Sequence, residues 1–251
     1  MNLNRTVMCA LAMACAPHLA VAADLMTGMS APAAPPAMAT TYDWSGGYVG
    51  GQIGYGWGNT NAGPASFYTY PAGDFAGSIS GFGFNTAGAI GGAEVGYGWV
   101  SHNLYLGIEA DISASGIKGS YTDDVNRFSV DSTLQWLSTA RVRVGVPINR
   151  VLLFASGGLA AGGVRGDLHD FYAGPGTINS SSSSTGFGWT AGVGAAVALN
   201  NRWTVKAEYL YADLGTQPYN FVEPTGPLWS HITTSAHTTA SIARVALDYR
   251  F

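Results

Sequence analysis

The sequence predicts an all-β protein: an eight-stranded, antiparallel, up-and-down transmembrane β-barrel with four long outer loops and short periplasmic turns. Three observations predict this fold: few charges, alternation of residue type with period two, and connections that alternate between short and long. Hydrophobic residues make up 47% of the 251-residue chain and charged residues only 10%, against about 25% in soluble domains. The net charge of −4 also argues against nucleic-acid binding, which needs a basic surface.

Residues 1–22 are predicted to be a secretory signal peptide. Arg5 supplies the positive charge, residues 7–16 form a short apolar run, and residues 20–22 form an A-x-A cleavage pattern. The apolar run is shorter than the roughly 20 residues that a transmembrane helix needs. A lipoprotein signal ending at Cys15 is the alternative interpretation.

The remaining chain is predicted to hold a lead-in segment and one domain. Residues 23–41 are rich in Ala and Pro, which is typical of a flexible segment without a core, and residues 42–251 form the predicted barrel. The two cysteines, Cys9 and Cys15, both lie in the predicted signal peptide. We therefore expect no disulfide, thiolate metal site or cysteine nucleophile after processing.

Eight segments alternate with period two, and their lengths suit the roughly 9–11 residues with which a tilted strand crosses a membrane. The predicted strands are 46–57, 88–100, 104–112, 134–146, 151–162, 187–199, 203–212 and 238–251. Tight turns are predicted at 101–103, 147–150 and 200–202, and long loops at 58–87, 113–133, 163–186 and 213–237. Strict alternation of short and long connections places all long loops at one end of the sheet, as in outer-membrane barrels.

The two faces of the predicted strands differ in charge. An Arg or Lys that faces lipid at the bilayer midplane costs about 2–4 kcal/mol, whereas charges inside a narrow barrel are tolerated when they are paired. The charged face should therefore line the lumen, with five acids balancing five bases. The predicted lumen charges are Glu94, Glu109, Asp111, Arg141, Arg143, Lys206, Glu208, Arg244, Asp248 and Arg250.

The alternation assigns the faces of segment 134–146 but not those of segment 151–162. In segment 134–146, alternation places Leu134 and Trp136 on the lipid face and Gln135 in the lumen. The pattern of segment 151–162 does not assign its faces.

Aromatic residues gather toward both ends of the apolar face, which predicts two girdles at the lipid–water interfaces. At the long-loop end these are Tyr55, Trp57, Trp136, Trp189, Tyr209 and Tyr211, and at the short-turn end Tyr97, Trp99, Trp203, Tyr249 and Phe251. The alternative is a soluble sandwich whose core the aromatics fill. A sandwich would not sort them into two belts.

Three stretches resemble a known family: residues 44–55 (WSGGYVGGQIGY), residues 105–111 (YLGIEAD) and the terminal residues 245–251 (VALDYRF). Their order resembles the small outer-membrane immunogenic, or porin-family, proteins of alphaproteobacteria, within the OmpA-like β-barrel superfamily. The resemblance covers residues 42–251 and implies an outer-membrane location. It also implies that Leu247, Tyr249 and Phe251 form the signal that the barrel-assembly machinery reads. Members of the family have been linked to envelope integrity, diffusion and haemin binding.

The sequence predicts no catalytic, metal or cofactor site. His231 and His237 share the last predicted loop with Glu223, and Asp213 opens that loop, but a haemin or metal site needs converging ligands. The other mature histidines, His102 and His169, lie in a predicted turn and loop. A hydrolase is not expected, because residues 180–184 look like a low-complexity loop tip and no G-x-S-x-G motif occurs.

The sequence therefore predicts a structural or surface role in the cell envelope, with outer-membrane lipid and the assembly machinery as partners. A porin-like diffusion channel is the alternative, because inner-face glycines such as Gly96, Gly107 and Gly194 could leave a thin passage. Against a channel, an eight-stranded barrel is just wide enough for side chains to fill it. A soluble ligand carrier, with apolar residues inside and charges outside, is the third class.

Overall fold

The computed structural model describes residues 42–69, 74–124, 128–170, 179–222 and 229–251, which belong to one compact unit, Ala39–Phe251. The predicted signal peptide and lead-in lie outside the described residues. The strands are β1 (Gly46–Ala62), β2 (Ala65–Thr69), β3 (Phe75–Ile79), β4 (Phe82–Ser101), β5 (Leu104–Asp123), β6 (Phe128–Ile148), β7 (Val151–Asp170), β8 (Asn179–Ala198), β9 (Trp203–Val222) and β10 (Trp229–Arg250). No helix in the described part of the chain is long and apolar enough to cross a membrane.

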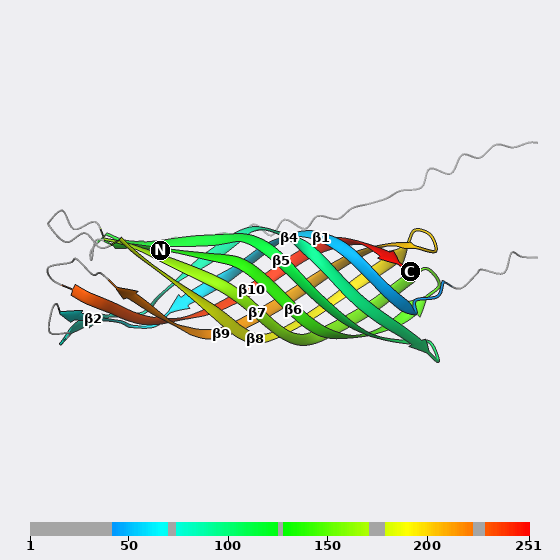
Figure 1. Cartoon of the computed structure of the whole chain (residues 1–251), viewed down its shortest axis with the longest axis horizontal. Coiled ribbons are helices and arrows are strands. Elements are labelled where there is room, and N and C mark those ends of the chain that lie inside the picture. The colour runs from blue at the N-terminus through cyan, green and yellow to red at the C-terminus, as the bar shows by residue number, and fades with distance from the viewer. Residues whose placement is uncertain (1–41, 70–73, 125–127, 171–178, 223–228) are drawn as a thin grey trace, which may run out of the picture. The chain divides into compact units, whose positions relative to one another are not determined.

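Eight long strands close into a ring, which confirms the predicted barrel (Figure 1). Strands β1 and β4 to β10 pair antiparallel in chain order. The ring closes between β1 and β10, from the pair Tyr48–Arg250 to the pair Ala62–Ala236. Closure removes the open edges of the sheet, so strand partners satisfy backbone groups that lipid could not.

Strands β2 and β3 extend the hairpin of β1 and β4. The pairing of Ala62 with Phe82 continues, in the same register, as the pairing of Ala65 with Ile79. Pro64 separates β1 from β2 and has no backbone N–H to donate to a ladder. Segment 58–87, which the sequence predicts as a loop, is therefore largely strand.

The other predicted loops also begin and end as strands. β5 continues to Asp123 and β6 starts at Phe128, so most of segment 113–133 is paired. Ser180–Ser184 lie within β8, not at a loop tip.

The strands are longer than a membrane crossing requires. A 20-residue strand such as β9 spans about 66 Å. At a tilt of about 40° it rises about 50 Å, roughly twice the 25 Å apolar band of an outer-membrane barrel.

The short connections are tight, as predicted. His102 and Asn103, between β4 and β5, have φ values of 49° and 64°, as in the primed two-residue turns whose twist suits a hairpin. Asn149, between β6 and β7, has a φ of 54°. We call the end that carries these turns the short-turn end and the opposite end the long-hairpin end.

Side chains alternate between the outer surface and the lumen. On β5, Ile108 is 53% exposed while Glu109 is 3% exposed. The same alternation holds along β9, where Val205 is exposed and Lys206 is buried. A soluble carrier would have apolar residues inside and charged residues outside. Around Glu109 and Lys206 the barrel has the opposite arrangement, which excludes a soluble carrier for this part of the wall.

Two assignments on β6 are wrong, and β7 can now be assigned. Leu134 is buried and Gln135 exposed, the reverse of the prediction. The register shifts at Gln135, so the residues before the shift lie on the opposite face from the one that the alternation after it predicts. On β7, Leu152 and Phe154 are buried while Leu153 is exposed. Apolar residues on both faces explain why β7 shows no clear alternation.

A second irregularity bends β9. Its register with β10 shifts between Asp213 and Thr216, and Gly215 there has a φ of +71°. The ladder between β8 and β9 ends at the pair Trp189–Asp213, whereas β9 and β10 stay paired to Val222. The bulge thus separates the long-hairpin halves of β8 and β9.

Candidate functional site in the barrel lumen

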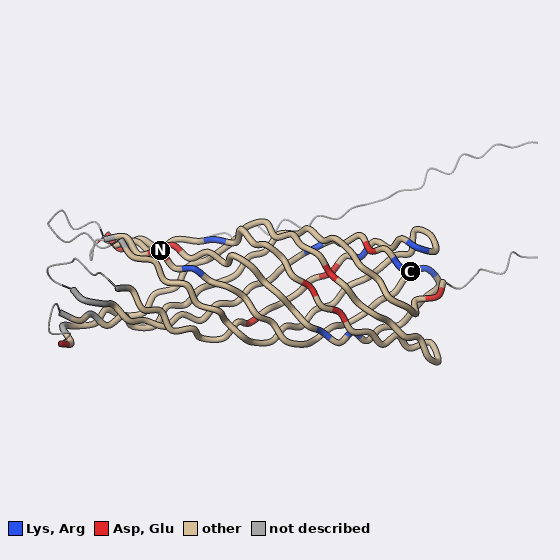
Figure 2. The backbone as a smooth tube through the Cα atoms, in the orientation of Figure 1, with Lys and Arg blue, Asp and Glu red and all other residues tan. Residues whose placement is uncertain are grey.

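Ten charged side chains converge inside the barrel from β4, β5, β6, β9 and β10. Figure 2 shows charges gathered in the half of the barrel toward the C-terminus, which is the short-turn end. All ten residues predicted to line the lumen are at most 8% exposed. Burial of this kind is tolerated only when the charges pair and fill their hydrogen-bonding capacity.

Glu109 is the centre of the network. One carboxylate oxygen, Oε2, accepts hydrogen bonds from Arg143 Nη1 at 2.8 Å, Lys206 Nζ at 2.7 Å and Tyr48 Oη at 2.6 Å. The other oxygen, Oε1, pairs with Arg141 Nη2. Lys206 also pairs with Glu94, so it bridges two acids on neighbouring strands. One acid therefore joins four strands across the lumen.

Arg141 and Arg244 bind the remaining two acids of the network. Arg141 lies 2.6 Å from Glu208 Oε1 and 3.1 Å from Asp111 Oδ2. Arg244 lies 2.6 Å from Glu208 Oε2 and 3.3 Å from Asp111 Oδ2. Thr139 donates a further hydrogen bond to Asp111 at 2.5 Å. Each acid thus contacts two guanidinium groups.

Among the described residues, neither Asp248 nor Arg250 forms an ion pair with this network. The guanidinium of Arg250 donates to the carbonyl of Trp44 and lies 5.5 Å from the ring of Tyr48. Within the part of the chain that the structure describes, Asp248 forms no ion pair, and its Oδ1 atom is buried without a hydrogen-bond partner. The connected network therefore contains four acids and four bases, and it is neutral without these two residues.

An aromatic layer fills the lumen at the short-turn end. Trp44 and Tyr105 are each 1% exposed, and Leu152 and Phe154 pack with them in one cluster. The Arg143 guanidinium lies 3.7 Å from the centre of the Phe154 ring, within range of a cation–π interaction. The sequence alternation gave no sign of this layer, because Trp44 precedes β1 and Phe154 lies on the unassigned strand.

An apolar layer fills the lumen toward the long-hairpin end. The layer is one cluster of buried side chains that continues to Tyr219 and Phe221. Its most buried members are Leu210 and Leu214, at 0% exposure, and Ile117, Leu137 and Ile242, at 1–2%. Burial raises the pKa of Tyr219 to about 12. The polarity of the wall therefore inverts along the barrel: apolar outside near the short-turn end and apolar inside near the long-hairpin end.

The glycines of the inner face make room for large side chains from the same strand or a neighbouring one. A methyl group at Gly96 would overlap the ring of Tyr48, and one at Gly107 would lie 2.7 Å from Tyr105 Oη. A methyl group at Gly194 would likewise overlap the ring of Phe154. The space that glycine leaves is occupied, so these glycines do not line a passage.

The predicted girdle residues all lie on the outer surface, where neighbouring rings pack in pairs. Two pairs lie at the long-hairpin end, in what we call the upper belt. Their ring centres are 6.1 Å apart in Trp57–Tyr209 and 5.4 Å apart in Trp189–Tyr211. At the short-turn end, Tyr97–Trp99 and Trp203–Tyr249 are 4.8 and 5.1 Å apart. Trp136 is half-buried beside Gly163. The outer surface thus carries two aromatic belts with smaller residues between them.

The residues of the predicted assembly signal share the outer face of β10. Leu247 is 47% exposed and Phe251 80% exposed, and Tyr249 is half-buried against Trp203. The backbone N–H of Phe251 donates to the carbonyl of Gly47 at 3.2 Å, which anchors the chain end to β1.

The histidine side chains that the structure describes do not converge. His102 lies in a turn, and His169 Nε2 lies 3.8 Å from Asp131 on β6. His237 Nε2 lies 2.8 Å from Asp213 Oδ1. The side chain of His231 and residue Glu223 lie outside the described residues. Among the residues described, no group of three or more potential metal ligands occurs.

Asp213 fixes the bulge of β9. Its Oδ1 atom accepts from the Gly215 backbone N–H at 2.8 Å and contacts His237 across the strand pair. Partial burial opposes ionisation of Asp213, but these hydrogen bonds outweigh it and hold the pKa of the carboxyl below its usual value.

A closed ring of antiparallel strands, an apolar outer surface between two aromatic belts and a charged, filled interior together define a small outer-membrane β-barrel. The sequence pattern of the family described as "Outer membrane protein beta-barrel domain" matches residues 7–251, and the chain belongs to this family. The predicted family resemblance and the outer-membrane location are confirmed.

Named relatives agree with this placement. The chain is 32% identical over 240 residues to the 31 kDa outer-membrane immunogenic protein of Brucella melitensis, covering 92% of this chain and 93% of that protein. It is 31% identical over 152 residues to the 22 kDa outer membrane protein of Rhizobium leguminosarum, covering 61% and 63% of the two chains. Among solved structures, the outer membrane protease OmpT of Escherichia coli matches with a TM-score of 0.48 at 8% identity, covering 81% of this chain and 97% of that one.

Proposed function

We propose that this protein has a structural and surface-exposed role in the outer membrane and that its lumen does not conduct solutes. The observation that carries the proposal is the filling of the lumen in three successive layers: the aromatic layer around Trp44, the neutral ion-pair network around Glu109, and the apolar layer around Leu210.

Each layer opposes conduction in a different way. The aromatic layer blocks the short-turn end by bulk. The ion-pair network binds its members to one another, so a passing ion would have to break buried pairs, and losing one partner of a buried pair costs about 3–5 kcal/mol. The apolar layer offers a passing ion no polar group, and desolvation of an ion is expensive.

The surface role rests on the strands that extend past the upper aromatic belt. On β9, the outward residues beyond Tyr211 include Thr216, Pro218 and Asn220, all exposed. Such a polar outer surface suits water, not hydrocarbon. The proposal includes no catalysis, and the 31 kDa Brucella relative is named as an outer-membrane immunogenic protein, not as an enzyme.

The proposed partners are membrane lipid and the assembly machinery. Lipid would contact the outer face between the belts. The assembly machinery would read Leu247, Tyr249 and Phe251, which share the outward face of the last strand.

Single-channel recording tests the proposal. Refolded protein is added to a planar lipid bilayer, and a general diffusion porin in the same bilayer shows that pore currents are detectable. We expect no stable conductance steps from this protein. Steady steps that scale with salt concentration would overturn the closed-lumen proposal in favour of the diffusion channel.

A variant with a perforated lumen provides the matched control. Substituting Leu210→Gly and Ile242→Gly removes two large side chains from the apolar layer without touching the ion pairs. If the apolar layer blocks the lumen, the variant should conduct ions better than the native chain does. Equal, steady currents in both would show that the layer does not close the barrel.

A further inference from the structure

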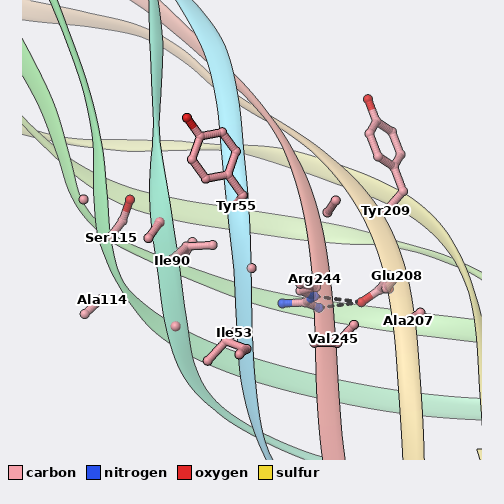
Figure 3. Close-up of a pocket in the computed structure, with 15 residues that line it drawn as sticks. Ile53, Tyr55, Ile90, Ala114, Ser115, Ala207, Glu208, Tyr209, Arg244 and Val245 are labelled. Atoms are coloured by element: carbon pink, nitrogen blue, oxygen red, sulfur yellow. Dashed lines mark hydrogen bonds and ion pairs between the residues drawn. The ribbon is translucent and has the colours of Figure 1, made fainter. Parts of the chain in front are cut away.

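The outer wall carries a groove within its apolar band. Small residues form its floor, with Gly91 on β4, Ala114 on β5 and Ala207 on β9, and Ala243 on β10 continues the floor between them. Tyr55 and Tyr209 stand at its upper end, as Figure 3 shows. Its volume is about 1160 Å³.

The groove is part of the outer surface and not of the lumen. Glu208 and Arg244 lie along it, but both side chains are buried and form an ion pair at 2.6 Å (Figure 3). Ile53 and Val245, which line the groove, are 69% and 49% exposed. The exposed lining is therefore apolar.

The opposite wall has a smaller hollow. Its outward positions on β6, β7 and β8 include Val142, Leu153 and Val193, which are 49–59% exposed and have branched side chains. The hollow on that side, lined by Leu153 and Val193 among others, has a volume of about 540 Å³, roughly half that of the groove. Hydrocarbon chains can therefore approach the backbone more closely along the groove.

The upper end of the groove is polar. The Tyr209 hydroxyl donates a hydrogen bond to Ser241 Oγ at 2.9 Å, and the ring of Trp57 packs against Tyr209. These residues belong to the aromatic belt at the long-hairpin end, where a membrane changes from hydrocarbon to head groups. A lipid whose chain lay in the groove would place its carbonyl groups beside these hydroxyls.

We propose that this groove binds one acyl chain of an outer-leaflet lipid, with the carbonyl that joins the chain to its head group beside Tyr209 and Ser241. The groove is continuous with the lipid-facing surface, so hydrocarbon is the occupant with direct access to it. Hydrocarbon is as apolar as the groove, so the hydrophobic effect adds little. The preference comes from close van der Waals packing on small residues and from the polar rim.

Photo-crosslinking tests this assignment. The folded protein is placed in vesicles of phosphatidylethanolamine and phosphatidylglycerol that contain a trace of phospholipid with a diazirine at the middle of one acyl chain. After irradiation, peptide mass mapping locates the adducts. We expect about fivefold more adducts along the groove, at Ala89–Gly91 and Ala243, than at Val193 and Val197 on the opposite wall.

Filling the groove provides the decisive comparison. The double variant Ala207→Leu/Ala243→Leu occupies the floor with larger side chains and should lower adducts at Ala89–Gly91 about fivefold. The control Ala140→Leu/Ala191→Leu adds the same bulk at outward positions away from the groove and should leave those adducts unchanged. Heat-modified gel mobility confirms that each variant is folded before irradiation.

Two results would overturn the proposal. Equal labelling of both walls would show that lipid chains do not prefer the groove. Absence of lipid adducts along the groove, together with a disulfide-linked dimer of the variant Ala243→Cys, would show that a second copy of the chain occupies it. The test is independent of conduction, because a conducting barrel would present the same outer wall.

Discussion

The substitution Arg141→Leu tests the packed lumen most sharply among single changes. The Arg141 side chain is fully buried and pairs with Glu109, with Glu208 at 2.6 Å and with Asp111 at 3.1 Å. Leucine has no charge, so the network of four acids and four bases would keep four acids and three bases. The variant should lose stability because one buried negative charge is left without compensation.

The magnitude follows from the partners that remain. Glu109 keeps Lys206 at 2.7 Å and Arg143 at 2.8 Å, while Glu208 and Asp111 keep Arg244. Loss of one partner from a buried pair costs about 3–5 kcal/mol. Since each acid retains a cation, we expect the free energy of unfolding to fall by about 3 kcal/mol, at the lower end of that range.

Urea unfolding in detergent micelles, followed by tryptophan fluorescence and gel mobility, measures this change. Arg165→Leu is the control, because Arg165 pairs with Asp167 on the exposed surface and its loss should change stability little. Adding Glu208→Leu to Arg141→Leu restores the balance of charge and should recover part of the loss. If Arg141→Leu proved as stable as Arg165→Leu, the lumen would be solvated and the closed-barrel reasoning would fail.

Three further predictions follow from the same structure. Gly96→Ala should displace Tyr48 from Glu109 and lower the unfolding free energy by about 1–3 kcal/mol. Gly116→Ala is the control and should leave the unfolding free energy unchanged, because its methyl group would lie no nearer than 3.6 Å to another atom. Equal urea midpoints for the two variants would refute the prediction. Amides of Ser181–Thr185 should exchange with deuterium faster than those of Ala191–Val197, because the β8–β9 ladder ends at Trp189; uniform protection along β8 would contradict the bulge-separated strands. Because its folded pKa is depressed, the Asp213 carboxylate contributes stability that is complete above its unfolded pKa of about 3.9 and is lost as the pH falls through the lower folded value. Protection of the Gly215 amide against deuterium exchange should therefore be lower in strong acid than at neutral pH. In the variant Asp213→Asn, this protection should be the same at the two pH values.

The sequence predicts the membrane-spanning half of this barrel well because lipid outside and paired charges inside impose a strict alternation. Glu109 and Ile108 show the principle: the chain cannot place the acid toward hydrocarbon, so the period-two pattern assigns both faces of β5. The same contrast assigns β4, β9 and β10. It is absent from β7, where Phe154 and Leu153 make both faces apolar.

The long-hairpin half was harder to predict for a physical reason. Beyond the upper belt the surroundings change from lipid to water, so the polarity of the wall inverts and strands rich in Ser, Thr and Gly look like loops. The bulges at Gln135 and Gly215 also shift the alternation by one residue, which interrupts the pattern where it would otherwise continue. The alternation predicts the charged layer of the lumen but not its aromatic layer, because Trp44 precedes β1 and Phe154 lies on β7, whose two faces are both apolar.

The central claim is that β9 leaves hydrocarbon at the upper aromatic belt while its strand structure continues. Site-directed spin labelling measures this directly, since both cysteines lie in the predicted signal peptide and single labels can be introduced. Labels at Val205 and Ala207 should be accessible to oxygen and shielded from a water-soluble nickel complex, and labels at Thr216 and Asn220 should show the reverse. Equal nickel accessibility at all four positions would contradict the membrane placement on which the account depends.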